Sequence, residues 1–167
     1  AHVLAFDIGE ELVAQARERA EHLGIGNIEF RVADIFEFQA DERFDAVSLM
    51  GVLTCISDDN AAARVLLNAT SLLKPGGLLI LKDSVLLHGH EPRYLLTEHY
   101  EAKYRPEARY LALIRSMGLH EVANYPLLTM DNCEQTSVLY LFRPVLTQQP
   151  SLPIRGLRVA CYGSMPF

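Results

Sequence analysis

Short apolar segments alternate with amphipathic stretches through the first half of the chain, and this alternation constrains the fold more than any other feature. Each apolar segment reads as a buried strand, and three of the four are closed or followed by an aspartate. The amphipathic stretches carry apolar residues at helical spacing. Such alternation predicts a parallel sheet with right-handed crossovers. The predicted strands are Ala1–Asp7, Asn27–Ala33, Phe44–Met50 and Leu78–Lys82, and the predicted helices are Glu10–Leu23 and Asp58–Leu73.

The second half of the chain departs from this rhythm. Lys74–Gly77 predicts a turn, because its proline cannot extend a helix and its glycines can adopt positive φ. Glu107–Met117 is predicted to be a helix, and His120–Thr129 and Ser137–Phe142 an antiparallel hairpin. The predicted fold class is therefore α/β: a doubly wound, mostly parallel sheet with a C-terminal antiparallel hairpin.

The chain is predicted to divide into a domain of residues 1–145, a linker of residues 146–156 and a final segment of residues 157–167. The linker is polar and contains two prolines. Leu157–Tyr162 is apolar again and is ended by Gly163. This last piece is either an extra strand or the first strand of a following α/β domain, and the second interpretation is favoured.

Composition and charge argue against several classes of function. Half of the residues are hydrophobic and 22% are charged, which is typical of a globular domain. The formal net charge is -6 and no Lys/Arg run occurs, so no nucleic-acid partner is expected. The apolar runs are short, so no membrane span is expected, and no secretory signal is visible. The three cysteines are far apart and form no CxxC pair, which favours reduced thiols in a cytoplasmic protein.

Acidic residues stand at the predicted carboxyl ends of three parallel strands: Asp7, Asp34 and Asp83. Ligands of open parallel sheets bind beyond these ends. Asp7 and Asp34 are separated by one helix and one strand, which suits a nucleoside. One carboxylate can accept hydrogen bonds from both ribose hydroxyls, and the second can accept from an adenine amine. Helix capping is the alternative role for either residue.

At these residues the sequence resembles the class I S-adenosylmethionine-dependent methyltransferases. The resemblance covers about residues 1–144 and rests on the order and spacing of several short motifs, of which the turn and strand Leu72–Leu81 is the most specific. It implies a methyltransferase that uses S-adenosylmethionine as its cofactor. The motifs that carry it are Ala5–Gly9, Ile28–Ile35, Phe44–Ser48 with Val52-Leu53, Leu72–Leu81 and the terminal hairpin.

The resemblance also implies roles for individual residues. Asp7 would bind the ribose hydroxyls, and Ile8 would pack on the adenine face. Asp34 would accept from the adenine amino group, and the backbone N–H of Ile35 would reach a ring nitrogen. Met50 and Gly51, at the end of the strand that corresponds to the family's fourth, would lie near the methionine part of the cofactor. Core packing is the alternative for the side chains of Ile8, Ile35 and Met50.

The sequence departs from the family at its first strand and glycine-rich GxGxG loop, which should precede Ala1. A fragment or clipped sequence is the favoured explanation. A circular permutation that places the first strand at Leu157–Gly163 is the alternative, although Ala160–Ser164 holds only one glycine. Without the loop, the chain alone is expected to bind S-adenosylmethionine poorly. A further departure is Gly9, where the family often carries Ser or Asn.

Methyl transfer is an in-line displacement, so alignment of the reactants matters most and a base is needed only for some acceptors. Candidate catalytic bases are His88 and His90, with His99 a third possibility, because histidine titrates near neutral pH. The His88-x-His90 pair lacks a third ligand, so no metal site is expected. Two roles are open for the tyrosines at 94, 100, 104 and 110: lining an acceptor pocket, or ordinary packing of a helix face.

The acceptor expected from these features is a small molecule, a sugar or a protein N or O atom. The fourth strand does not end in an Asn/Asp-Pro-Pro-aromatic run, which argues against methylation of nucleic-acid amino groups. No acidic cluster follows Met50, which argues against a magnesium-dependent catechol type. Two other functions stay open: an NAD(P)-binding oxidoreductase domain, and a non-catalytic methyltransferase-like module that serves a neighbouring domain.

Overall fold

The fold is built on parallel strands that the apolar segments of the sequence form. The computed structural model describes residues 1–98, 100–129, 134–145 and 158–163. The predicted strands are all present, and only the last of them is much longer than expected. These strands are β1 (His2–Asp7), β2 (Ile28–Val32), β3 (Phe44–Met50) and β4 (Leu73–Leu86). β1 pairs in parallel with β2, and β3 pairs in parallel with β4.

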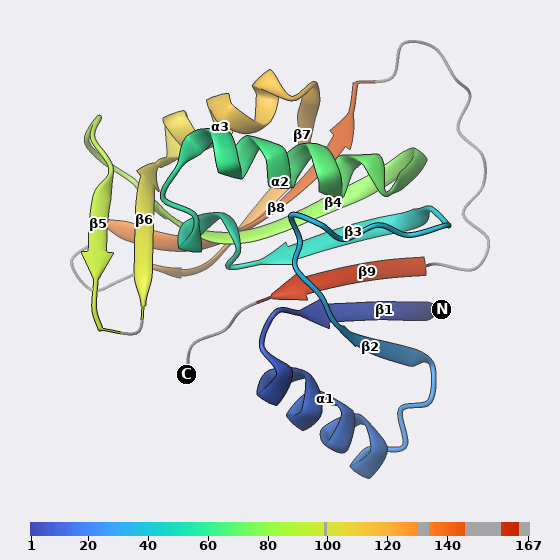
Figure 1. Cartoon of the computed structure of the whole chain (residues 1–167). Helices are drawn as coiled ribbons and strands as arrows, with labels where there is room; N and C mark the ends of the chain where they lie inside the picture. The colour runs from blue at the N-terminus through green and yellow to red at the C-terminus, as the bar shows by residue number, and fades with distance from the viewer. Residues whose placement is uncertain (99, 130–133, 146–157, 164–167) are drawn as a thin grey trace.

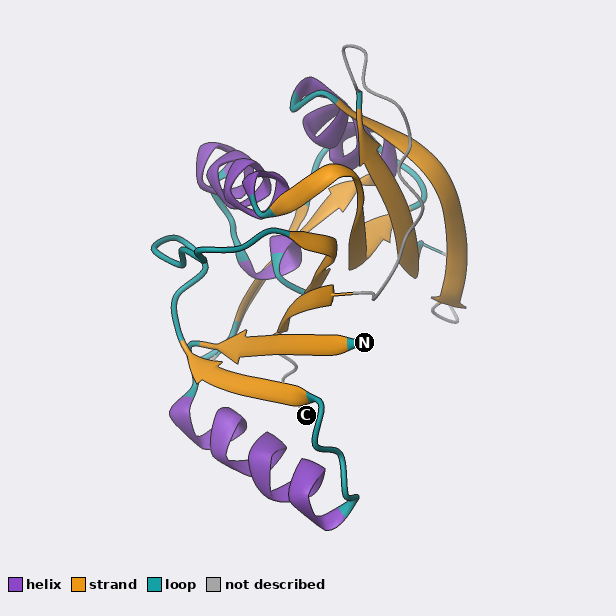
Figure 2. Ribbon diagram, turned by 90° about the vertical axis from the view of Figure 1, so that its right-hand side faces the viewer, coloured by secondary structure: helices purple, strands orange, loops and turns teal. Residues whose placement is uncertain are grey.

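Three α-helices follow the predicted amphipathic stretches: α1 (Glu10–His22), α2 (Asp59–Ser71) and α3 (Glu107–Ser116). Helix α2 begins where predicted, because the carboxylate of Asp58 accepts a 2.7 Å hydrogen bond from the N–H of Ala61. The strands β1 and β2 lie between α1 and the other two helices (Figures 1 and 2). No helix in the described ranges has the length and hydropathy needed to cross a bilayer.

The main core lies between the sheet and the helices α2 and α3. Leu4 and Phe6 of β1 belong to it, and the Phe6 ring stacks on Phe38 at 4.0 Å between centroids. The buried residues of α1, Val13 and Ala20, are outside this cluster. Because side chains alternate between the two faces of a strand, this division fits a sheet with helices on both faces. The doubly wound α/β fold is thereby confirmed.

The predicted C-terminal hairpin is also confirmed. β7 (Leu119–Thr129) pairs antiparallel with β8 (Gln135–Pro144), and β8 pairs antiparallel with β4. Residues 130–133, between these two strands, lie outside the described residues. A second hairpin was not predicted: β5 (Arg93–Leu96) and β6 (Glu101–Pro106) pair antiparallel, and β6 joins β4 in parallel at Val85 and Leu86.

Two local predictions are wrong. Lys74–Gly77 is not a turn between separate elements but an irregularity inside β4, where the register jumps from Phe44↔Leu73 to Ala46↔Leu78. Gly76 still adopts positive φ, at 76°. Asp83 does not stand at a strand end, because β4 continues beyond it to Leu86 along β8. β4 is longer than predicted because it pairs with β8, which lies far from it in sequence.

The last described strand, β9 (Arg158–Gly163), lies inside the sheet between β1 and β3 and is parallel to both. The strand order is β2-β1-β9-β3-β4-β6-β5, with β8 and then β7 added to β4. This position agrees with the interpretation of an extra strand of the same sheet, because β9 pairs with β1 and β3. The predicted linker lies outside the described residues, so the division into domains stays a prediction.

Candidate active site

The carboxyl ends of β1 and β2 lie next to each other at one edge of the sheet. Asp7 is the register partner of Val32, and the N–H of Ala33 donates a 3.0 Å hydrogen bond to the carbonyl oxygen of Asp7. Asp34 follows one residue later. The parallel pairing therefore brings both predicted acids to neighbouring strand ends, where ligands of such sheets bind.

The carboxylate of Asp7 is buried and only half satisfied. Its Oδ1 atom accepts a 2.8 Å hydrogen bond from the N–H of Gly9, the residue before α1. Its Oδ2 atom is also buried and has no hydrogen-bond partner among the described residues. Buried polar atoms are nearly always paired, so an orphaned carboxylate oxygen at a strand end is a place for a ligand donor.

Asp34 and Ile35 form a tight turn after β2. The Asp34 Oδ1 atom accepts a 2.8 Å hydrogen bond from the N–H of Phe36. The carbonyl oxygen of Asp34 accepts from the N–H groups of Glu37 and Phe38. Within the described residues the N–H of Ile35 donates no hydrogen bond, whereas its side chain is buried in the core. The N–H of Ile35 is thus available to a ligand. The burial of the Ile35 side chain supports core packing as its role.

Ile8 and Gly51 directly follow β1 and β3. Ile8 is 59% exposed, so it does not pack in the core and offers an apolar surface beside Asp7. Met50, at the end of β3, is only partly buried. Gly51 turns the chain with φ 76°, and its N–H donates a 2.6 Å hydrogen bond to the carbonyl oxygen of Lys82. Positive φ at this position favours glycine.

The loop after β3 is fixed by a buried carboxylate that the sequence did not place correctly. The Oδ1 atom of Asp83 accepts from the backbone N–H and the hydroxyl of Thr54, at 2.9 and 2.8 Å. Its Oδ2 atom accepts from the hydroxyl of Tyr110 at 2.8 Å. Burial raises the pKa of Asp83, and the hydrogen bonds from Thr54 and Tyr110 only partly offset this effect. Burial and the nearby Asp83 likewise raise the pKa of Tyr110.

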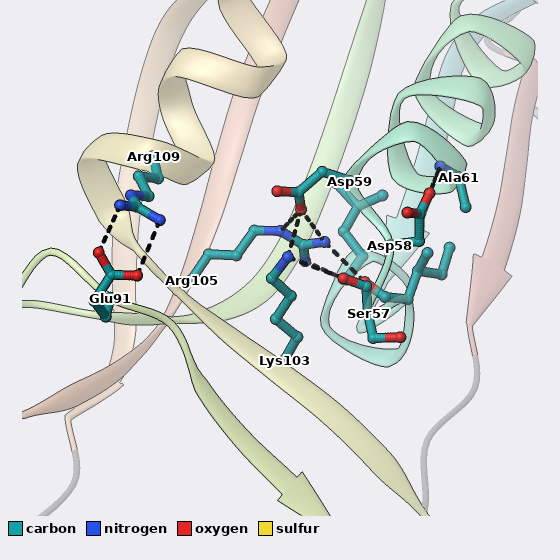
Figure 3. A network of polar contacts seen from close by, with 10 residues as sticks. Ser57, Asp58, Asp59, Ala61, Glu91, Lys103, Arg105 and Arg109 are labelled. Atoms are coloured by element: carbon teal, nitrogen blue, oxygen red, sulfur yellow. Dashed lines mark hydrogen bonds and ion pairs between the residues drawn. The ribbon is translucent and has the colours of Figure 1, made fainter.

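Two cations of β6 hold the next part of the same loop (Figure 3). Arg105 donates to the carbonyl oxygens of Leu53 and Ile56, at 2.7 and 2.8 Å, and to Asp59 Oδ1 at 2.8 Å. Lys103 donates to the carbonyl oxygen of Ser57 at 2.9 Å and to the same Asp59 atom at 2.8 Å. Together with Asp83, these side chains fix the segment from residue 53 to residue 59.

Asp59 serves as the shared anion of this network. Burial alone would raise its pKa, but hydrogen bonds from Lys103 and Arg105 outweigh that effect and the pKa lies below its usual value. Lys103 and Arg105 are buried, whereas the Asp59 side chain is 60% exposed. The ionised Asp59 carboxylate therefore pairs with both cations and offsets part of the cost of burying them beneath the loop.

The predicted catalytic histidines are not brought to the acidic edge by any contact among the described residues. His88 and His90 are exposed in the loop between β4 and β5, and His99 lies outside the described residues. The four tyrosines do not form one helix face. Tyr94 is on β5, Tyr110 is buried in α3, and the Tyr100 hydroxyl lies 4.0 Å from Cys55 Sγ. No cluster of three metal-ligating side chains occurs in the described part of the chain.

Solved structures of methyltransferases share this fold. A methyltransferase from Methanosarcina mazei described as S-adenosylmethionine-dependent superposes with a TM-score of 0.69 at 16% identity, over 87% of this chain and 82% of that one. The N-methyltransferase NodS from Bradyrhizobium japonicum, in complex with S-adenosylhomocysteine, gives 0.63 at 19% identity, over 86% and 66%. A 1,6-didemethyltoxoflavin N1-methyltransferase from Burkholderia thailandensis, with its substrate and S-adenosylhomocysteine bound, gives 0.63 at 15% identity, over 84% and 70%.

Sequence comparison gives the family directly. No curated protein matches the chain significantly. A family model described as a methyltransferase domain matches residues 1–137, which include the acidic edge, the loop after β3 and the start of β8. The chain therefore belongs to the methyltransferase-domain family.

Proposed function

We propose that this chain binds S-adenosylmethionine at the carboxyl ends of β1 and β2 and transfers the methyl group to a small-molecule acceptor. One observation carries the proposal: the Oδ2 atom of Asp7 is buried at a strand end without a hydrogen-bond partner among the described residues. A ribose hydroxyl is a donor of the right kind for this atom.

The neighbouring groups fit the rest of an adenosine. Asp34 is partly exposed and retains acceptor capacity for an exocyclic amine. The N–H of Ile35 is a donor suited to a ring nitrogen, and the exposed Ile8 side chain suits the face of an aromatic base. The end of β3, at Met50 and Gly51, is the proposed position for the methionine part.

S-adenosylmethionine, when bound, supplies a methyl group on a positively charged sulfur. The chain's own contribution is to hold and orient the reactants, which is the largest effect available for an in-line displacement. A rigid loop after β3 serves this purpose, and Thr54 and its neighbours are fixed by Asp83 and Arg105. His88 and His90 stay proposed bases for an acceptor that must lose a proton, since both are exposed at the carboxyl end of β4.

The solved relatives support a small-molecule acceptor. Two of them are N-methyltransferases with S-adenosylhomocysteine bound, and one also holds 1,6-didemethyltoxoflavin. The net charge of -6 supports the same conclusion by disfavouring a polyanionic acceptor.

Calorimetric titration with S-adenosylhomocysteine and, separately, with NADH tests the class of ligand. The proposal predicts heat of binding with S-adenosylhomocysteine and none with NADH at the same concentrations, and the affinity is expected to be low where the glycine-rich loop is missing. Binding of NADH alone would favour an oxidoreductase domain. Transfer of label from methyl-labelled S-adenosylmethionine to a panel of small amines and alcohols then tests catalysis, and binding without transfer to any acceptor would favour a non-catalytic module.

A further inference from the structure

A small cavity lies between β6, α3 and the first residue of α2, and it shares no lining residue with the proposed cofactor site. Three of its lining side chains are cations and only one is an anion. Its volume of about 40 Å³ has room for about three water molecules, which suits a single charged group and excludes a nucleotide. The lining residues are Asp59, Pro92, Lys103, Arg105, Pro106, Arg109 and Leu113.

The positive charge of this cavity is only partly compensated (Figure 3). Lys103 and Arg105 are more than nine-tenths buried, and both donate to the Oδ1 atom of Asp59. That carboxylate is mostly exposed, so water screens part of its charge. Arg109 pairs with Glu91, which is also mostly exposed. Two buried cations that share one solvated carboxylate would therefore be stabilised by a further anion beside them.

Each of the three cations also has a hydrogen-bond donor left for such an anion. An ammonium group carries three N–H donors and a guanidinium group carries five. Lys103 donates to two acceptors within the described residues, so one of its N–H groups is left. The Nη1 atom of Arg105 donates to one acceptor there and has a second N–H. Arg109 donates through Nη1 and Nη2, and its Nε has no acceptor among the described residues.

Asp83 is not the anion that balances this cavity. Its charge interacts with that of Arg105, but Asp83 is not among the lining residues. Its two carboxylate oxygens accept hydrogen bonds from Thr54 and Tyr110 instead. Burial also raises the pKa of Asp83, which disfavours its ionised form. The position beside the cations is therefore left to an anion from outside the chain.

We propose that this cavity binds one oxyanion group, a phosphate or a carboxylate. Two arginines and a lysine suit such a group, because their N–H donors form short, charge-assisted hydrogen bonds to its oxygens. Asp59 and Arg109 are both more than half exposed, so the group can enter from solvent. It is either a free ion or a group that the methyl acceptor carries. The anion site does not depend on the proposed function and would stand even if the chain binds no S-adenosylmethionine.

Titration with inorganic phosphate, followed by two-dimensional amide NMR at constant pH and ionic strength, tests the site. Saturable shifts are expected for the amides of residues 103–109 and for the Nε–H groups of Arg105 and Arg109. Arg109→Met is expected to weaken phosphate binding about tenfold, because it removes one charged donor. Arg115→Met is the matched control: Arg115 is on the same helix, is equally exposed and does not line the cavity.

Asp59→Asn tests the sign of the charge that the cavity prefers. The variant keeps both buried cations but loses the carboxylate that they share, so it is expected to bind phosphate about tenfold more tightly than the parent. Phosphate should then raise the thermal transition temperature of the variant more than that of the parent. Asp41→Asn, at an exposed acid outside the cavity, should respond to phosphate like the parent.

Three results would overturn the anion site. They are the absence of saturable shifts at residues 103–109, equal phosphate affinity of the Arg109→Met and Arg115→Met variants, and weaker binding of phosphate by Asp59→Asn than by the parent.

Methyl transfer to β-alanine and to β-alaninamide distinguishes the two sources of the oxyanion group. If the parent prefers the acid and Arg109→Met loses that preference, the group belongs to the acceptor. Phosphate binding combined with equal transfer to both compounds, or with transfer to neither, identifies a free ion. Only this last comparison uses the proposed methyl transfer, so its failure leaves the phosphate titration as the test of the site.

Discussion

The hydroxyl of Tyr110 on α3 donates a 2.8 Å hydrogen bond to Asp83 Oδ2 on β4, and both side chains are fully or almost fully buried. Asp83 in turn holds Thr54, so one carboxylate joins a helix, a strand and the loop after β3. A buried acid with three donors is a structural support beneath the candidate site, because it fixes a loop without facing solvent.

Tyr110→Phe is expected to lower the free energy of unfolding by about 1–3 kcal/mol, because it leaves Asp83 Oδ2 buried without this donor. Urea denaturation followed by circular dichroism measures the change. Tyr125→Phe is the matched control, since Tyr125 is 53% exposed and its substitution should change stability by less than about 0.5 kcal/mol. Equal stability of the two variants would contradict a structural role for the Tyr110–Asp83 pair.

The pH dependence of stability should reveal the raised pKa of Asp83. The folded chain holds the Asp83 proton more tightly than the unfolded chain, so unfolding releases it. Stability therefore falls as the pH rises from the unfolded pKa of about 3.9 through the higher folded pKa. Asp83→Asn removes this contribution, so the stability of the variant relative to the parent should increase with pH across that window, as measured by urea denaturation at a series of pH values.

Asp59→Asn provides a comparison of opposite sign. The pKa of Asp59 is lowered in the folded chain, so its ionised form contributes stability that is present above the unfolded pKa and is lost as the pH falls through the lower folded pKa. The variant should be less stable than the parent at neutral pH, and the difference should shrink in acid. The same trend for both variants would contradict the assignment of one of the two pKa shifts.

Arg105→Met should destabilise the chain by about 3 kcal/mol or more, because it removes a buried cation from two backbone carbonyls and from Asp59. Arg109→Met is the matched control. Arg109 pairs with Glu91 on the surface, where both side chains are more than half exposed, so its loss should cost less than about 1 kcal/mol. Amide hydrogen exchange of residues 53–58 should speed up in the Arg105 variant alone. Unchanged exchange there would show that Arg105 does not fix the loop.

Gly9→Ser should stabilise α1 relative to Gly9→Ala by about 0.5–2 kcal/mol. Gly9 is the N-cap of α1, with extended φ and ψ of -80° and 107°, and no side chain caps the helix. A Cβ atom there would lie 3.2 Å from Leu12 Cδ1 in both variants, so the difference between them isolates the capping hydroxyl. Thermal unfolding of the two variants measures it, and identical transition temperatures would rule out capping by Ser.

Local patterns predicted most of the fold. The apolar segments gave β1, β2 and β3 close to their observed bounds, and helical spacing gave α1, α2 and α3. These elements form from contacts near in sequence and from one buried face, which periodicity reveals. The terminal hairpin was predictable for the same reason.

The elements that were missed depend on distant partners. β6 carries Lys103 and Arg105, and charged side chains of this kind normally indicate an exposed segment. Both are buried here, because Asp59 and backbone carbonyls more than forty positions away in sequence accept their hydrogen bonds. β4 extends past Asp83 because β8 continues beside it. β9 pairs with β1 and β3, and nothing local in the sequence indicates these partners.

In the candidate site, too, some residues could be predicted from local patterns and others depend on distant partners. The strand-end acids Asp7 and Asp34 were predictable from spacing, because parallel neighbours end at the same edge. The loop supports, Asp83 with Tyr110 and Arg105 with Asp59, join residues that only the folded chain brings together. An acid inside an apolar run, such as Asp83 between Leu81 and Val85, is the one signal in the sequence that could have indicated such a support.

The affinity of the Asp7→Ala variant for S-adenosylhomocysteine, measured by calorimetry against the parent chain, tests the central claim most directly. Loss of the orphaned acceptor should weaken binding by about 1–3 kcal/mol. Asp41→Ala, an exposed acid-to-alanine change between β2 and β3, should bind like the parent, and matching thermal transitions would show that the Asp7 variant is folded. Affinity unchanged by Asp7→Ala would contradict the claim that this carboxylate holds the cofactor.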